Sequence, residues 1–131
     1  MVRDGTYLIG TNSMITQMDL PMIYQSHILK FRIVDKNVID PYLFFLCLNC
    51  SLVQRQIKNM QFTADIIDTL GNRYRELILP IPKNAERKKY LIEKTKNAIE
   101  TRIKFKAAIK QMPLLIEKII ANRDLTVFNE F

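Results

Sequence analysis

Glycine, cysteine and histidine are scarce in this chain of 131 residues, which has three glycines, two cysteines and one histidine. So few glycines provide no glycine-rich loop of the kind that holds a nucleotide cofactor. Cys47 and Cys50 have the Cys-x-x-Cys spacing of zinc and redox sites, but a structural zinc site needs four ligands and only His27 could supply a third. The pair also ends an apolar helical run, whereas a redox pair usually begins a helix. We therefore expect buried, reduced core cysteines and no bound metal.

Long apolar runs are missing as well. No stretch reaches transmembrane length, and the first residues lack the basic and apolar regions of a signal peptide. We therefore expect a cytoplasmic chain that does not bind a membrane. The composition, with 48% hydrophobic and 25% charged residues, is typical of a folded, soluble domain.

Positive charge is concentrated in the last third of the chain. The net charge is +7, and residues 83–123 contain twelve Lys and Arg against four Glu. Two interpretations stay open at this point. The excess is either the solvated outer face of a helix or a surface for phosphates or an acidic partner.

Apolar residues in the same region recur three and four positions apart, from about residue 84 to residue 122, which predicts a long pairing helix. Packing against the rest of the chain as ordinary core is the alternative. The charged Arg102 favours a helix partner, because a buried charge is costly unless paired and commonly sets register. The simplest arrangement is an antiparallel pair of two copies, and Pro113 should kink the helix. The predicted pairing residues are Leu91, Ala98, Arg102, Phe105, Ile109, Met112, Ile116 and Ile119.

The first two thirds read as a small α+β module. Asp40 followed by Pro41 predicts a helix start, since a carboxylate caps the helix and proline suits its first position. Apolar spacing continues this helix to Ile57, and Ser51-Leu52-Val53-Gln54 fits a capping box, which allows a break near Asn49. Short strands are expected at residues 5–9, 14–18, 27–34 and 77–82, a loop with a short strand at 61–68, and a turn at 70–72.

The predicted fold class is therefore α+β. It consists of a small mixed or antiparallel sheet with one or two short helices, followed by a long, coiled-coil-like C-terminal helix. Residues 1–83 would form the module, residues 84–123 the pairing helix and residues 124–131 a loose tail.

The order of these features carries a family resemblance. After the basic strand come Asp40-Pro41-Tyr42-Leu43-Phe44-Phe45-Leu46, Val53-Gln54-Arg55-Gln56-Ile57, Thr63-Ala64-Asp65-Ile66-Ile67-Asp68-Thr69-Leu70, Leu79-Pro80-Ile81-Pro82 and the long helix. From about residue 5 to residue 122, this order resembles the distal half of a target recognition domain, with its spacer helix, from the specificity subunit of a type I restriction-modification system. The family usually opens the helix with a Glu-Gln pair, of which only Glu86 is present here.

The resemblance implies a non-catalytic module that reads duplex DNA in a sequence-specific way and needs no cofactor of its own. Its spacer helix would pair with a second such helix and dock a methyltransferase subunit, which modifies adenine with S-adenosylmethionine. A nuclease-translocase subunit would join that complex. The proximal half of the family domain is missing, so we expect a truncated gene, a half-subunit that pairs with itself, or a fragment.

Three segments offer the donors, acceptors and cations that DNA recognition requires. The candidate DNA-binding residues are Thr11, Asn12, Ser13 and Gln17 in one loop, Lys30 and Arg32 on the predicted strand 27–34, and Lys58, Asn59, Gln61 and Thr63 in a second loop. The alternative for both loops is that turns are rich in Asn and Thr for backbone reasons alone.

Two other functions are alternatives to DNA recognition. Asp40-Pro41-Tyr42 is similar to the Asp-Pro-Pro-Tyr signature of amino-methyltransferases, but it lacks the second proline and opens a helix, so a helix cap is favoured over catalysis. The second is a structural or interaction protein that binds an acidic partner through its basic helix and reads no DNA. A salt-dependent gel shift on mixed duplex separates this function from DNA recognition.

Overall fold

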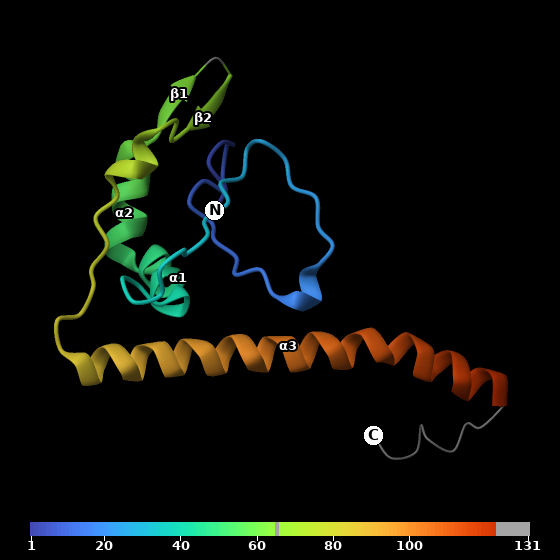
Figure 1. The fold of residues 1–131 in the computed structure, drawn as a ribbon. Coiled ribbons are helices and arrows are strands. Elements are labelled where there is room, and N and C mark those ends of the chain that lie inside the picture. Colours follow the sequence, from blue (N-terminus) through green and yellow to red (C-terminus); the bar gives the residue numbers. More distant parts are fainter. Residues whose placement is uncertain (65, 123–131) are drawn as a thin grey trace. The chain divides into compact units, whose positions relative to one another are not determined.

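The computed structural model describes residues 1–64 and 66–122. It is an α+β fold, as predicted, with one small antiparallel sheet, short helices and a long C-terminal helix (Figure 1). In chain order the elements are η1 (Gln17–Asp19), α1 (Pro41–Asn49), α2 (Ser51–Met60), β1 (Phe62–Ala64), β2 (Ile67–Thr69), η2 (Arg73–Glu76) and α3 (Ala85–Asn122). The chain divides into one compact unit, Met1–Asn97, and a second that begins at Ala98. The tail predicted at residues 124–131 lies outside the described residues.

Helix α1 begins where the sequence predicts. The Asp40 carboxylate accepts hydrogen bonds from the backbone nitrogens of Tyr42, at 2.8 Å, and Leu43, at 3.3 Å, and Pro41 is the first helical residue. The helical run breaks at Cys50, whose backbone is extended (φ −72°, ψ 152°), so the predicted break near Asn49 is confirmed.

The predicted capping box at the start of α2 is wrong. Cys50 rather than Ser51 is the N-cap, and it makes no side-chain cap bond. The Gln54 amide instead donates to the carbonyl oxygens of Leu48, at 2.7 Å, and Gly10, at 3.2 Å. The last carbonyls of a helix lack intrahelical partners, so the end of α1 competes successfully for this side chain.

The sheet is a hairpin of β1 and β2, which extends from the C-terminal end of α2 (Figure 1). Its register pairs Phe62 with Thr69, Thr63 with Asp68 and Ala64 with Ile67. Single bridges between Asp4 and Thr69 and between Val2 and Ile28 continue the pairing toward the N-terminal segment. The turn predicted after the hairpin is confirmed, with Gly71 at a φ of +50°.

The strands predicted at residues 5–9, 14–18, 27–34 and 77–82 are wrong. Helix η1 overlaps the second, and the third contributes only the Ile28 bridge. In the fourth, two prolines remove backbone donors. The Gln56 side chain donates to the carbonyl oxygen of Ile78 and accepts from its backbone nitrogen, each at 2.9 Å. A segment with an alternating pattern forms a strand only where a neighbouring strand can pair with it. In these four segments, the backbone polar groups are satisfied by side chains or turns instead.

The core of the Met1–Asn97 unit lies between α2 and the segments that cover it. Val53 and Ile57, one turn apart on α2, are 0% and 1% exposed, and they cluster with Met1, Leu48 and Leu70. Both cysteines are free, as predicted, with Cys47 buried and Cys50 half-buried. Burial raises the pKa of the Cys47 thiol, which therefore stays protonated at neutral pH.

Helix α3 is continuous over 38 residues. The Asn84 side chain accepts a hydrogen bond from the Arg87 nitrogen at 2.8 Å, which satisfies one of the free donors at the helix start. The helix runs through Pro113 without a break, and its ribbon curves in this C-terminal part (Figure 1). Within the described ranges, no helix combines the length and the apolar character that crossing a membrane requires.

Candidate nucleic-acid interface

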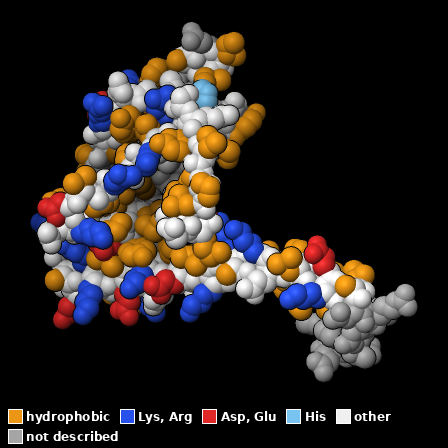
Figure 2. Space-filling view, turned by 45° about the vertical axis from the view of Figure 1, so that its right-hand side comes forward, with side chains coloured by type: hydrophobic (Ala, Val, Ile, Leu, Met, Phe, Trp, Pro, Cys, Tyr) orange, Lys and Arg blue, Asp and Glu red, His pale blue; other side chains and the backbone are white. Residues whose placement is uncertain are grey.

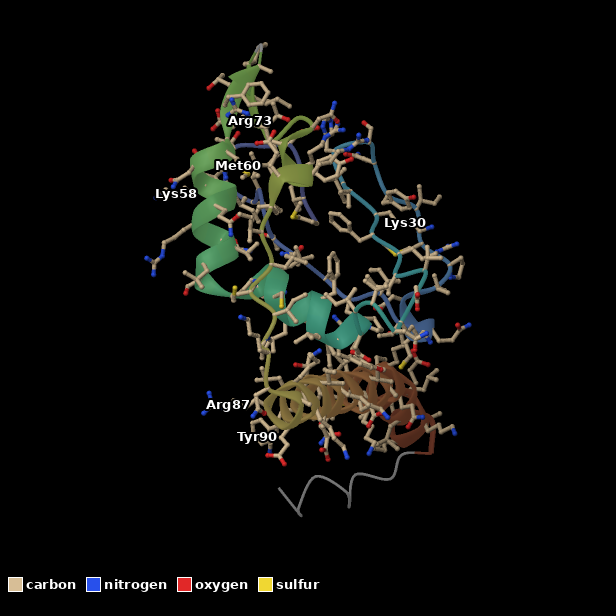
Figure 3. All side chains as sticks on the ribbon, turned by 60° about the vertical axis from the view of Figure 1, so that its left-hand side comes forward. Lys30, Lys58, Met60, Arg73, Arg87 and Tyr90 are labelled. Atoms are coloured by element: carbon tan, nitrogen blue, oxygen red, sulfur yellow. The ribbon has the colours of Figure 1, made fainter. Side chains whose placement is uncertain are left out.

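The second predicted DNA-binding loop is the junction between α2 and the hairpin. Lys58 and Asn59 are exposed on the last turn of α2, Gln61 is the half-buried residue that ends the helix, and Thr63 is exposed on β1. These four residues are therefore presented together. Lys58, Met60 and Arg73 lie along this junction in the stick view (Figure 3).

Arg73, which is not among the predicted residues, belongs to the same surface. Its guanidinium lies 5.3 Å from the centroid of the Phe62 ring and donates to the Met60 carbonyl oxygen at 3.3 Å. A guanidinium has five N–H donors, so these contacts orient the group and leave donors for a phosphate. In the sequence, Arg73 could have been found as a basic residue directly after the turn at Gly71. That turn returns the chain to the base of the hairpin.

Thr63 and Asp68 form a polar pair across the hairpin. They are register partners, and the Thr63 hydroxyl donates to an Asp68 carboxylate oxygen at 2.8 Å. This bond fixes the orientation of both side chains. The hairpin therefore presents a hydroxyl and a carboxylate in defined positions beside the cations at its base.

The first predicted loop has a mixed outcome. The Asn12 amide donates to the carbonyl oxygen of Gly10 at 2.5 Å and reaches that of Leu48 at 3.5 Å, so it ties the N-terminal segment to the end of α1. This is a structural task, and it uses the donors that a base would need. Thr11, Ser13 and Gln17 are exposed.

Lys30 and Arg32 are exposed on the long N-terminal loop rather than on a strand. The Lys30 ammonium lies 5.8 Å from the centroid of the Tyr24 ring. Figure 3 shows Lys30 well separated from Lys58 and Arg73. The structure therefore does not combine these two predicted residues with the α2–hairpin junction.

A buried carboxylate holds the hairpin to the N-terminal segment. The Asp4 side chain is 7% exposed and pairs with Arg3 at 2.7 Å. It also accepts from the Thr69 hydroxyl at 2.5 Å and meets Nδ1 of His27 at 3.1 Å. The Arg3 hydrogen bond, supported by those of Thr69 and His27, holds the pKa of Asp4 well below its usual range.

The predicted pairing residues all lie on α3, but they are divided between the two compact units of the chain, which meet after Asn97. In the Met1–Asn97 unit, Leu91 is half-buried and lines a small cavity of about 130 Å³ with Cys47 and Pro80. Ala98 is exposed and Arg102 half-buried. Farther along, Phe105 and Met112 are 66% and 58% exposed, and Ile109 and Ile116 are also exposed, whereas Ile119 is half-buried. Figure 2 shows apolar side chains, with Lys and Glu among them, on this last part of α3.

The class that the structure defines is a small α+β module followed by a long amphipathic helix. No family model, no curated protein and no solved structure matches this chain. Over the described residues, no three His, Cys, Asp or Glu side chains are grouped so that they could hold a metal ion. The surface chemistry of the chain itself therefore carries the functional argument.

Proposed function

We propose that this chain is a non-catalytic DNA-specificity module of a cytoplasmic restriction-modification complex. The observation that carries the proposal is the β1–β2 hairpin, on which Phe62, Thr63 and Ile67 are exposed, with Lys58 and Arg73 at its base. The major groove of B-DNA admits a two-stranded β-ribbon, and cations beside such a ribbon reach the flanking phosphates.

The side chains at this junction divide into two roles. Lys58 and Arg73 would contact phosphates, which positions the hairpin and supplies salt-dependent affinity. The exposed Asn59 amide suits the edge of adenine, whereas the Asp68 carboxylate accepts from the amino group of cytosine. Because the Thr63–Asp68 hydrogen bond already orients that carboxylate, base recognition would need little reordering.

Helix α3 would provide assembly rather than DNA recognition. The exposed apolar residues between Phe105 and Ile120 would pack against a partner helix. We propose pairing with a second copy and docking of a methyltransferase subunit, to which a nuclease-translocase subunit would be added. Light scattering tests the self-pairing: the full chain should be dimeric, and Arg102→Leu should change its oligomeric state. A monomeric chain, or a dimer that Arg102→Leu leaves unchanged, would contradict the role of this face.

The DNA proposal is tested by selecting binders from a pool of randomised duplexes and measuring their affinity by gel shift. The full chain should enrich a defined sequence. Lys58→Ala should weaken binding to all duplexes similarly, whereas Asn59→Ala should relax the preference at one position by roughly 1–3 kcal/mol. Lys36→Ala is the matched control, because Lys36 is exposed on the N-terminal loop. Equal recovery of all sequences, or no binding at low salt, would contradict DNA recognition and favour the alternative of an interaction protein.

A further inference from the structure

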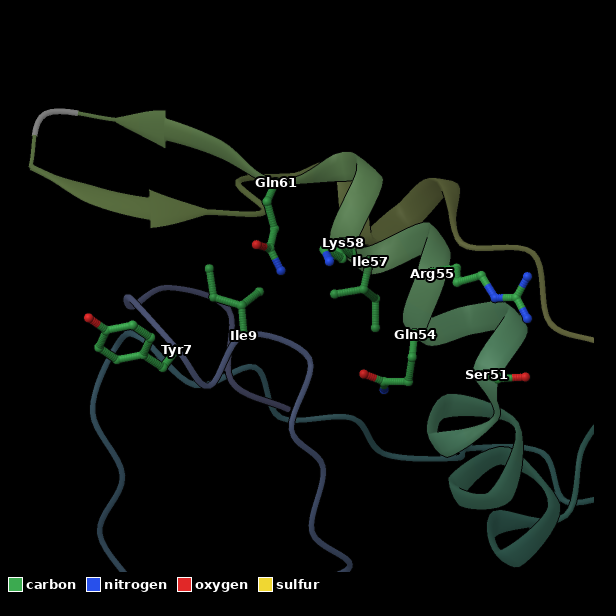
Figure 4. Close-up of a pocket in the computed structure, with 8 residues that line it drawn as sticks. All are labelled: Tyr7, Ile9, Ser51, Gln54, Arg55, Ile57, Lys58 and Gln61. Carbon is green, nitrogen blue, oxygen red and sulfur yellow. The ribbon is translucent and has the colours of Figure 1, made fainter.

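An open groove of about 510 Å³ lies between the N-terminal segment and α2 (Figure 4). Its volume falls in the range of small-molecule sites, roughly 300–1,000 Å³. Ile9 and the buried Ile57 form an apolar floor, and Tyr7 stands at one edge. All of these residues belong to the Met1–Asn97 unit.

The polar side of the groove follows from the pattern of α2. Ser51, Gln54, Arg55 and Lys58 are spaced three, four and seven residues apart, so they share one face of the helix. Arg55 and Lys58 are exposed. In Figure 4 Lys58 lies beside Ile57, whereas the Arg55 guanidinium points away from Ile9 and Tyr7. The described residues that line the groove include these two cations and no carboxylate, so its charge suits an anion.

Gln54 gives the groove an acceptor in a fixed orientation. Its amide nitrogen donates to the carbonyl oxygens of Leu48 and Gly10, at 2.7 and 3.2 Å. The amide oxygen consequently faces the side on which Ile9 and Tyr7 lie (Figure 4). The Gln61 amide also points toward the groove from its opposite end.

Tyr7 is the remaining unusual feature. Its side chain is 92% exposed, so its ring contributes almost nothing to the core of the unit. Proteins stack unpaired nucleic-acid bases on exposed aromatic rings. The ring therefore offers an uncovered face on which a ligand can stack.

We propose that this groove binds one nucleotide whose base has an exocyclic amine where thymine has its O4 and guanine its O6 acceptor, which means adenine (N6) or cytosine (N4). The base would stack on Tyr7 and donate its amine to the Gln54 oxygen, while the phosphate would lie near Lys58. The inference rests on the proposed DNA-binding function for its source, which is an unpaired nucleotide in a DNA strand. Thymine has no exocyclic amine and presents an acceptor in its place, so the Gln54 oxygen would repel it.

The test measures fluorescence anisotropy of short labelled single strands of adenine, cytosine or thymine with the full chain at low salt. Adenine and cytosine strands should bind more tightly than thymine strands. Tyr7→Ala should weaken adenine binding about tenfold through the lost stacking, and Tyr7→Phe should bind like the original chain. Tyr24→Ala is the matched control, since Tyr24 is an exposed ring outside the groove.

Equal affinity for the three strands, or adenine binding that Tyr7→Ala leaves unchanged, would overturn the inference. Thermal unfolding of Tyr7→Ala followed by circular dichroism should match the original chain and so excludes misfolding. If free deoxyadenosine monophosphate bound as tightly as the adenine strand that it displaces, the inference that the nucleotide belongs to a DNA strand would be overturned. The two proposals fail separately. If duplex binding is sequence-selective and survives Tyr7→Ala, and the three single strands bind equally, only the groove proposal is overturned. Tyr7-dependent strand binding without duplex selection removes only the duplex reader.

Discussion

Helix α2 and the last part of α3 have similar apolar spacing but different surroundings. Val53 and Ile57 on α2 are almost completely buried by residues such as Met1 and Leu70 of the same unit. Phe105 and Met112 on α3 are more than half exposed. Spacing therefore predicts that a helix has an apolar face, whereas the residues that cover this face are set by contacts distant in sequence.

The largest expected effect compares one isoleucine from each helix. Ile57→Ala should lower the free energy of unfolding by about 2–5 kcal/mol, because it leaves a cavity in a packed core. Ile116→Ala removes the same atoms from an exposed position and should change the free energy of unfolding by less than about 0.5 kcal/mol. Urea unfolding at a protein concentration that gives a monomer measures both. Equal losses would contradict the contrast between the two helices.

A second test adds an atom to the N-terminal cover of α2. A Cβ at Gly10 would lie 2.8 Å from Cγ2 of Ile57, and Gly10 has a φ of +87°. Gly10→Ala should therefore destabilise the unit by about 2 kcal/mol through overpacking and backbone strain. Gly5→Ala is the matched control, since Gly5 also has a positive φ but no atom within 4 Å of its Cβ position. The loss in urea unfolding should be clearly larger at Gly10.

The third effect concerns the carboxylate that joins the N-terminal segment to β2. The folded pKa of Asp4 is depressed, so its contribution is complete above the unfolded value, near pH 4, and is lost as the pH falls below it. Asp4→Asn should cost about 1–2 kcal/mol at neutral pH and should flatten the stability loss between about pH 4 and pH 2. Glu76→Gln, at an exposed residue, should retain that loss. An unchanged acid profile in Asp4→Asn would contradict the network.

The features that the sequence predicted correctly depend on residues close together in the chain. Asp40 with Pro41 predicted the start of α1, and repeated three- and four-residue spacing predicted α3, because both depend on neighbours in the chain. The predicted strands failed where partners lie far away, as at Ile78, whose backbone pairs with the Gln56 side chain. The groove beside Tyr7 was not predicted for the same reason, since it forms only where residues 7–9 meet α2.

The most direct test of DNA recognition by this chain is the salt dependence of its affinity for the selected duplex. The logarithm of the association constant should fall linearly with the logarithm of salt concentration, and Lys58→Ala should reduce the magnitude of that slope by about one. Lys36→Ala should leave the slope unchanged. Identical slopes for the original chain and Lys58→Ala, or no duplex binding at low salt, would contradict the assignment of the α2–hairpin junction as the DNA-binding surface.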